Sequence, residues 1–133
     1  MANPQIGDAF RINNPNYPTK HLYVVVCVSA GREIAVAFNF STYDTQNPLF
    51  DSACIVKPEE YPSGLREKSF VVYSEGLCID FSKWDKFISL CGGLTTSAPV
   101  TLSNKMRAGA IDSRRTAGKI KEICKASPAK PPL

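Results

Sequence analysis

The sequence lacks the features on which several protein classes depend. It contains one histidine, His21, and no C-x-x-C pair, so it offers no zinc-ligand spacing, and we expect neither a metal nor a cofactor. No apolar run approaches the roughly 20 residues that cross a bilayer, so we expect no membrane partner. The N-terminal segment also lacks a basic stretch followed by an apolar one, the arrangement typical of a secretory signal. The sequence therefore predicts a cytoplasmic protein.

Cysteine is present but shows no disulfide pattern. The five cysteines are Cys27, Cys54, Cys78, Cys91 and Cys124. They form an odd set, and three of them lie inside apolar, strand-like runs. A disulfide framework is therefore not expected, and buried thiols are the favoured interpretation.

Charge is divided unevenly along a chain of ordinary globular composition. With 133 residues, of which 44% are hydrophobic, the chain suits one domain with a modest core. The formal net charge is +4. From residue 101 onward eight basic residues stand against two acidic ones, a net +6, whereas residues 1–100 carry −2. We therefore expect any charge-driven attraction to nucleic acid to come from the C-terminal quarter.

Six short segments predict β-strands because they are apolar or alternate in polarity and are rich in β-branched and aromatic residues. Their ranges are 8–12, 22–29, 34–41, 53–57, 69–73 and 77–81. The second and third form the clearest hairpin, and the third places Phe38 and Phe40 on one face and Asn39 on the other. The fifth and sixth are predicted to pair across a tight turn at Ser74-Glu75-Gly76.

Helical periodicity follows the strands, and Gly92-Gly93 ends the first predicted helix. The chain shows neither an internal repeat nor strand–helix–strand alternation, which disfavours a doubly wound sheet. We predict one α+β domain, mainly β, built as a small antiparallel barrel of about six strands. The barrel with one short helix covers residues 1–100, basic C-terminal helices packed on or beside it cover 101–126, and 127–133 form a flexible tail.

Several segments carry a family resemblance. They are GDAFRI, HLYVVVCV, IAVAFNFST, DSACIVKPEEYP, SFVVYSEGLCI and SNKMRAGAIDS, which span Gly7 to about Ser113. Together they resemble the MazF/PemK-like toxin family, and more specifically a less studied bacterial group within it. The resemblance implies an SH3-like barrel followed by helices. It also implies a dimeric endoribonuclease that cuts single-stranded RNA without a metal, and whose RNA groove an antitoxin peptide occupies.

The resemblance assigns a catalytic set. Where the family usually places an arginine, between the first two strands, this chain has Lys20 and His21. A lysine offers a point charge for the phosphate without arginine's planar fork, and a histidine suits an acid or a base near neutrality. The family's hydroxyl matches Ser41 or Thr42, although these residues equally suit capping of a strand end. Asp51 is expected nearby to orient Lys20, or else to be a solvated loop acid.

Two groups of residues are predicted to contact RNA. Tyr61, Arg66 and Lys68 share a long loop, where an aromatic ring stacks on a base and the cations follow phosphates. The second group consists of Arg114, Arg115 and Lys119 in the basic C-terminal segment. Both compositions are also typical of solvated loops and helix ends.

Two functions follow. The first is a toxin-like, metal-independent endoribonuclease with single-stranded RNA, an antitoxin protein and a second copy of the chain as partners. The alternative is a non-catalytic module on the same barrel, which binds protein or nucleic acid through the groove or the basic helices.

Overall fold

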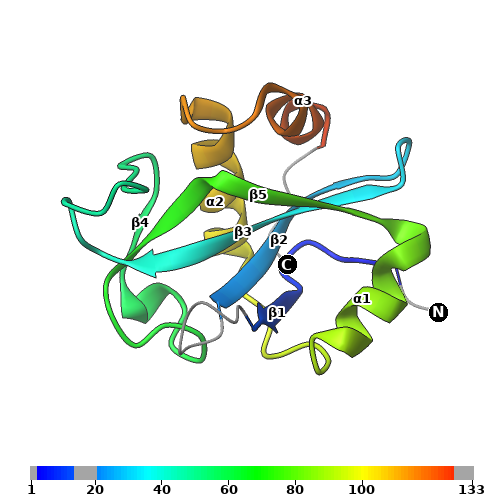
Figure 1. Ribbon diagram of the computed structural model, residues 1–133, viewed down its shortest axis with the longest axis horizontal. Helices are drawn as coiled ribbons and strands as arrows, with labels where there is room; N and C mark the ends of the chain where they lie inside the picture. Colours follow the sequence, from blue (N-terminus) through cyan, green and yellow to red (C-terminus); the bar gives the residue numbers. More distant parts are fainter. Residues whose placement is uncertain (1–2, 14–20, 128–133) are drawn as a thin grey trace.

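The structure is a computed structural model that describes residues 3–13 and 21–127. Lys20 and residues 128–133 of the expected tail lie outside these ranges. The described chain is α+β and mainly sheet (Figure 1). Its strands are β1 (Ala9–Ile12), β2 (His21–Ser29), β3 (Ile34–Thr42), β4 (Ile55–Val56) and β5 (Ser69–Asp80). Its α-helices are α1 (Trp84–Leu90), α2 (Val100–Asp112) and α3 (Gly118–Ala126), and short 3-10 turns cover Pro58–Glu60 and Phe81–Lys83.

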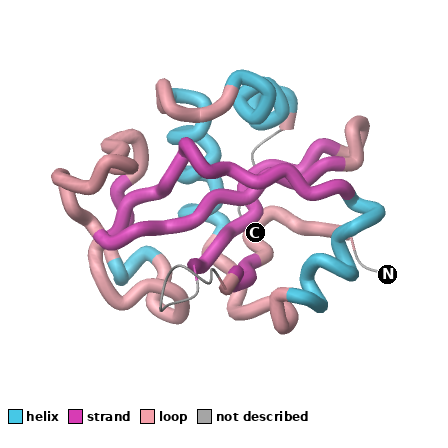
Figure 2. The backbone as a smooth tube through the Cα atoms, viewed as in Figure 1, coloured by secondary structure: helices cyan, strands magenta, loops and turns pink. Residues whose placement is uncertain are grey.

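The strands form one antiparallel sheet in the order β1-β2-β3-β5-β4 (Figure 2). Within the described ranges, β1 and β4 are the two edges and do not pair with each other, so the sheet is open. The prediction of about six strands is thus corrected to five in an open sheet. The hairpin of β2 and β3 is confirmed, with Val28 opposite Ala35 and Ser29 opposite Ile34.

The predicted turn at Ser74-Glu75-Gly76 is wrong, because residues 69–80 form the single strand β5. The pairing of β5 with β3 changes register between Ala37–Leu77 and Asn39–Val72, so β5 has extra residues at this point. Gly76 is needed here for close packing, since a Cβ on it would lie 2.6 Å from the Phe38 ring. The glycine therefore marks an irregularity within a strand rather than a chain reversal.

Both faces of the sheet are covered, because successive side chains of a strand point to opposite sides. On one face Phe38 and Phe40 join the larger apolar cluster with α2 and α3. On the other face Ala35 and Ala37 pack in a smaller cluster with Trp84 of α1. The predicted alternation of residues 34–41 is thereby confirmed, and Figure 1 shows α1 on the opposite side of the sheet from α2 and α3.

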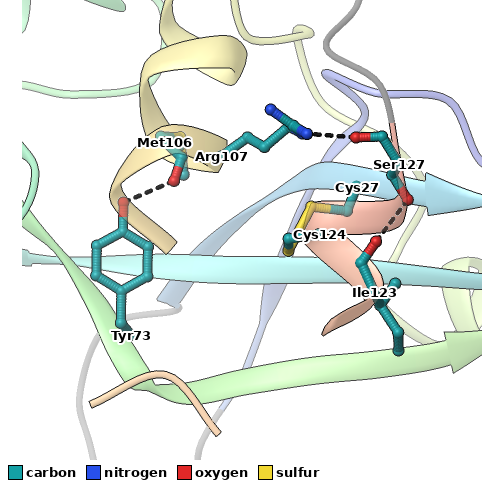
Figure 3. The surroundings of a disulfide bond; sticks show 7 residues. All are labelled: Cys27, Tyr73, Met106, Arg107, Ile123, Cys124 and Ser127. Atoms are coloured by element: carbon teal, nitrogen blue, oxygen red, sulfur yellow. Dashed lines mark hydrogen bonds between the residues drawn. A yellow bond between two sulfur atoms is a disulfide. The ribbon is translucent and has the colours of Figure 1, made fainter. Parts of the chain in front are cut away.

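A buried tyrosine joins α2 to β5. The Tyr73 hydroxyl donates to the carbonyl of Met106 at 2.7 Å (Figure 3). Burial raises the pKa of Tyr73 far above its usual range, so the hydroxyl remains a donor. Gly109 lets the helix approach this closely, because a Cβ there would clash with the same hydroxyl. No helix in the described ranges is both long enough and apolar enough to cross a membrane.

A disulfide bond joins Cys27 of β2 to Cys124 of α3, with a Cα–Cα distance of 5.4 Å (Figure 3). The expectation of thiols without a bridge is therefore wrong for this pair. The two residues are 97 positions apart, and sequence spacing alone cannot show that β2 and α3 pack together. Cys54, Cys78 and Cys91 are free.

The C-terminal end of α3 is also held by hydrogen bonds. The buried Ser127 donates through its hydroxyl to the carbonyl of Ile123 at 2.8 Å. Its own carbonyl accepts a hydrogen bond from Nε of Arg107 at 2.7 Å (Figure 3). Residue 127, predicted to begin the tail, is thus anchored between α2 and α3.

The disulfide is expected to contribute substantially to stability. Loop-closure entropy predicts that a Cys27→Ala/Cys124→Ala variant loses about 4–5 kcal/mol in the free energy of unfolding. The measurement is urea unfolding of this variant and the oxidised wild type, with Cys78→Ala, at an exposed free cysteine, as the control. Equal midpoints for wild type and double variant, or five alkylatable thiols in the denatured wild type, would contradict the bond.

Candidate functional site

A cleft of about 400 Å³ opens at one end of the sheet, where β1 and β3 end and β2 and β5 begin. We call it the outer cleft. Its polar lining residues are Arg11, His21, Ser41, Thr42, Arg66, Glu67 and Ser69. His21, Ser41 and Thr42 of the predicted catalytic set therefore line one cleft, together with Arg66 of the predicted RNA-binding set.

Strand pairing explains how the cleft is assembled. In the β1–β2 ladder Arg11 lies opposite Leu22, and Ile12 lies opposite His21. Paired residues of antiparallel strands point to the same face, so Arg11 and His21 reach the cleft from opposite faces of the sheet. Ser41 and Thr42 are consecutive and also approach it from both faces. The cleft thus wraps around the end of the sheet.

Tyr61 holds the loop that supplies Arg66. Its side chain is 1% exposed, and its hydroxyl donates to the carbonyl of Thr96 at 2.5 Å. The carbonyl of Tyr61 accepts hydrogen bonds from the N–H groups of Gly64 and Leu65, so a turn presents Arg66 at the cleft. At this degree of burial the Tyr61 ring has no exposed face for a base, and its role in the structure is to anchor the loop.

Hydrogen bonds fix the polar side chains of the cleft. The Thr42 hydroxyl donates to the carboxylate of Glu67 at 3.3 Å, and the Ser41 hydroxyl accepts from the Asn47 amide at 3.4 Å. The amide nitrogen of Asn39 lies 3.4 Å from Nδ1 of His21. When Nδ1 accepts this hydrogen bond, the ring proton sits on Nε2. The buried amide therefore orients the only imidazole of the chain.

A smaller hollow of about 170 Å³ adjoins the outer cleft and shares His21 and Ser41 with it. We call it the inner pocket. Its other lining residues are Tyr23, Asn39, Asn47, Leu49, Val72 and Glu75. Burial raises the pKa of Tyr23, and the nearby Glu75 carboxylate raises it further. His21 and Ser41 thus lie between the outer cleft and the inner pocket.

Asp51 lies elsewhere. One of its carboxylate oxygens accepts from the Ser113 hydroxyl at 2.5 Å, and the other accepts from the N–H of Ala53 at 2.9 Å. It lines a separate hollow of about 430 Å³ that shares no described residue with the outer cleft. Asp51 therefore joins its loop to the C-terminal end of α2, and the structure does not bring it together with His21.

The other predicted cations are also away from the outer cleft. The Lys68 ammonium lies 3.9 Å above the Tyr43 ring. Arg115 donates to the carbonyl of Pro48 at 2.7 Å, and it lines the hollow of Asp51 together with Arg114. Lys119 is exposed on α3. Only Arg66 of the predicted RNA-binding residues lines the outer cleft.

Sequence reasoning missed Arg11 and Glu67. Arg11 is the one charged residue in Ala9–Ile12, and this alternation predicted a strand without showing where the strand end would lie. Glu67 stands between two residues that were singled out, Arg66 and Lys68, and its carboxylate now holds Thr42. In each case the signal was a charged residue near a strand end. The residues that line the cleft beside it come from other strands and loops, so they are visible only in the structure.

The free cysteines do not provide a nucleophile here. Burial raises the pKa of the Cys54 thiol. Burial also raises the pKa values of Cys78 and Cys91. A raised pKa reduces the thiolate fraction on which reactivity depends. Over residues 3–13 and 21–127, no three His, Cys, Asp or Glu side chains are grouped to hold a metal ion.

Comparisons with known proteins found no relative: no family model matches the chain, and no curated protein or solved structure matches it. The chemistry of the cleft must therefore be inferred from its own residues.

The anchoring role of Tyr61 predicts a stability change without a change in RNA affinity. Tyr61→Phe removes the hydrogen bond to Thr96 and should lower the free energy of unfolding by about 1 kcal/mol. Urea unfolding measures the loss, and fluorescence anisotropy with a labelled single-stranded RNA measures the affinity. A folded Tyr61→Leu variant, which keeps the bulk but not the aromatic ring, that loses most of its RNA affinity while Tyr61→Phe keeps it would contradict this role and favour base stacking.

Proposed function

We propose that the outer cleft binds the phosphodiester backbone of single-stranded RNA, and that the protein is a toxin-like endoribonuclease that needs no metal. The observation that supports this most is the meeting of Arg11, Arg66 and His21 with hydroxyl groups in one cleft. Guanidinium groups suit phosphate because their planar fork donates two parallel hydrogen bonds. The two arginines also supply the geometry that a lysine at the family's arginine position lacks.

The reaction is a displacement within the RNA strand. The ribose 2′-oxygen attacks the adjacent phosphorus, the bond to the 5′-oxygen breaks, and a 2′,3′-cyclic phosphate and a 5′-hydroxyl result. One group must take the proton of the 2′-hydroxyl, and another must protonate the departing oxygen. Among the described residues that line the outer cleft, His21 and Glu67 are the acid–base groups. Arg11 and Arg66 would stabilise the charge that develops on the phosphate.

The family interpretation is part of this proposal. The segments between Gly7 and Ser113 support a MazF/PemK-like fold, although the described sheet is open and has five strands. The resemblance further leads us to propose a cytoplasmic protein that dimerises and whose cleft an antitoxin segment blocks. An acidic segment would suit the cleft, because its described lining contains two guanidinium groups and one carboxylate.

The alternative, a binding module that uses the basic C-terminal helices, has less support. Arg115 donates to the carbonyl of Pro48, and Lys121 donates to the carbonyl of Ser113 at 2.8 Å. Two cations of this segment therefore already bind the protein's own backbone, which reduces what they offer to an external phosphate.

The nuclease proposal predicts cleavage in the absence of metal. Wild-type protein incubated with long single-stranded RNA in excess EDTA should produce fragments with 2′,3′-cyclic phosphate ends. His21→Ala should reduce the rate at least about 100-fold, because it removes an acid–base group. Gel electrophoresis with end-group analysis measures both results. Arg114→Gln, outside the cleft, is the matched control and should cleave like the wild type.

Two results would contradict the proposal. One is cleavage that does not exceed that of His21→Ala. The other is cleavage that EDTA abolishes in the wild type.

Salt dependence distinguishes the outer cleft from the basic helices as the RNA contact. Each phosphate contact to a single strand contributes about 0.7 to the slope of log affinity against log salt concentration. Arg66→Gln should therefore weaken binding and flatten that slope by about 0.7. The double variant Arg114→Gln/Lys119→Gln should leave the slope unchanged, and anisotropy titrations over a range of salt concentrations measure both. An unchanged slope for Arg66→Gln, together with a flatter slope for Arg114→Gln/Lys119→Gln, would favour the binding module.

A further inference from the structure

The strand register places a buried amide beside His21. Asn39 of β3 lies opposite Tyr23 of β2 on one side and opposite Val72 of β5 on the other. His21 is two residues before Tyr23, so it points to the same face of the sheet and lies diagonally across from Asn39. The contact between the Asn39 amide and the imidazole therefore follows from the pairing of β2 with β3.

Packing alone does not account for an asparagine at this position. The Asn39 side chain is 2% exposed, and its Oδ1 has no hydrogen-bond partner among the residues that the structure describes. A buried polar atom without a partner destabilises a protein, so an apolar residue would suit this position better. Ala35 and Ala37, which precede Asn39 on the same face of β3, are apolar and buried. The contribution of the amide must therefore lie in its contact with His21.

The orientation of that contact matters for the proposed reaction. With Nδ2 of Asn39 donating to Nδ1 of His21 at 3.4 Å, the neutral ring carries its proton on Nε2. Such a ring has no bare nitrogen with which to take the proton of a 2′-hydroxyl. A protonated ring could supply a proton, but it carries a hydrogen on Nδ1 as well, and this hydrogen would face the donor Nδ2. Either acid–base role of His21 at Nε2 therefore requires an acceptor beside Nδ1.

The Asn39 side chain can supply that acceptor by a half-turn of its amide. The half-turn exchanges Oδ1 and Nδ2, two atoms of nearly equal size, so it changes the hydrogen bonding and leaves the packing almost unaltered. Within the described ranges no hydrogen bond holds Oδ1 in place. The amide of Asn47 is different, because it donates to Ser41 and accepts from the N–H of Leu49, which fixes both of its ends.

We propose that Asn39 is a positioning residue for RNA cleavage, and that its amide turns as the proton on Nδ1 of His21 comes and goes. In the resting form Nδ2 donates to the bare Nδ1. In the reactive form Oδ1 accepts from Nδ1–H, which leaves the exchange of a proton with RNA to Nε2. This inference rests on the proposed function, and it adds a third group to the acid–base pair of the outer cleft, as in other sites where one residue orients a catalytic histidine.

The protons balance in both roles. His21 is half-buried, so its ring can exchange protons with solvent, which supplies the proton on Nδ1. As a base, the reactive ring takes the 2′-hydroxyl proton on Nε2 and becomes an imidazolium. As an acid, the imidazolium gives the Nε2 proton to the departing 5′-oxygen and becomes neutral. The proton on Nδ1 stays with Oδ1 of Asn39 throughout either transfer.

The first test reads the ring directly and needs no RNA. Since the chain has one histidine, ¹⁵N NMR at alkaline pH shows which nitrogen of the neutral His21 ring carries the proton. In the wild type the proton should be on Nε2. Asn39→Asp places a permanent acceptor beside Nδ1 and should move the proton to Nδ1, whereas Asn39→Leu removes the partner and should give a mixture of both forms.

The second test measures cleavage of single-stranded RNA under single-turnover conditions. Asn39→Leu should reduce the rate at least about 10-fold, because Nδ1–H loses its acceptor. Its affinity for a 2′-O-methyl RNA oligomer, which lacks the attacking hydroxyl, should be unchanged. In a His21→Ala background Asn39→Leu should have no further effect, because the amide acts through the imidazole. Asn39→Asp should cleave at least about fivefold faster than Asn39→Leu, because the acceptor is the form that the reaction uses.

Thermal melts separate this role from a contribution to stability. Asn39→Leu should melt at or above the wild-type temperature, because it removes a buried atom without a partner. The matched control is Ile88→Ala, a partly buried residue of α1 in the smaller apolar cluster. It should lower the melting temperature and leave both the ring proton and the cleavage rate as in the wild type. If Asn39→Asp does not fold, the ring signals and the double-variant rates of Asn39→Leu decide.

Three outcomes separate the inference from the function on which it rests. Equal rates for Asn39→Leu and the wild type, or a loss that adds to that of His21→Ala, would reject the positioning role and leave the proposed nuclease standing. A folded Asn39→Asp variant that cleaves as slowly as Asn39→Leu would reject the turning amide. Absence of cleavage by the wild type rejects the proposed function, and the ring signals then decide alone whether Asn39 controls the imidazole.

Discussion

The pairing of β3 with β2 on one side and β5 on the other is the constraint from which the rest of the molecule follows. Because β3 is buried on both faces, its alternation decides which groups meet each layer of helices. The large side chains Phe38 and Phe40 meet α2 and α3 in one cluster, and the small Ala35 and Ala37 leave room for α1. The same alternation turns Asn39 toward His21, so the core and the candidate site share one register.

Much of this register was predictable, because it depends on local pattern. The apolar run of β2, the alternation of β3 and the hairpin between them are visible as short-range periodicity. The incorrect prediction of a turn at Gly76 shows that local pattern does not reveal contacts between strands. Glycine between two apolar runs usually marks a turn, but here it is required by the Phe38 ring, which comes from another strand. The disulfide between Cys27 and Cys124 was unpredictable for the same reason, since it depends on a contact between distant segments.

The candidate site was partly predictable. Ser41 and Thr42 were predicted from the family resemblance, which places a hydroxyl at the end of the third strand, and His21 because it stands beside Lys20 where the family has an arginine. Arg11 was missed since its importance depends on where β1 ends relative to β3. Charge arithmetic was misleading as well: residues 1–100 carry a net −2, yet two arginines from distant parts of that segment meet at one cleft. Net charge averages over a surface, whereas a ligand meets only the groups that line its own site.

The disulfide bond between Cys27 of β2 and Cys124 of α3 also divides the chain into two covalent parts. Residues 27–124 become a covalently closed ring, and the first 26 residues form an arm outside it. The outer cleft draws on both parts, because the arm supplies Arg11 and His21 while the ring supplies Ser41, Thr42, Arg66 and Glu67. A protease that cuts once inside the ring leaves all these groups on one covalent species. A cut between Ile12 and His21 instead leaves Arg11 held by noncovalent contacts alone, which are the pairing of β1 with β2, the hydrogen bond from Thr95 to the Ala9 carbonyl and the packing of Phe10 on Trp84.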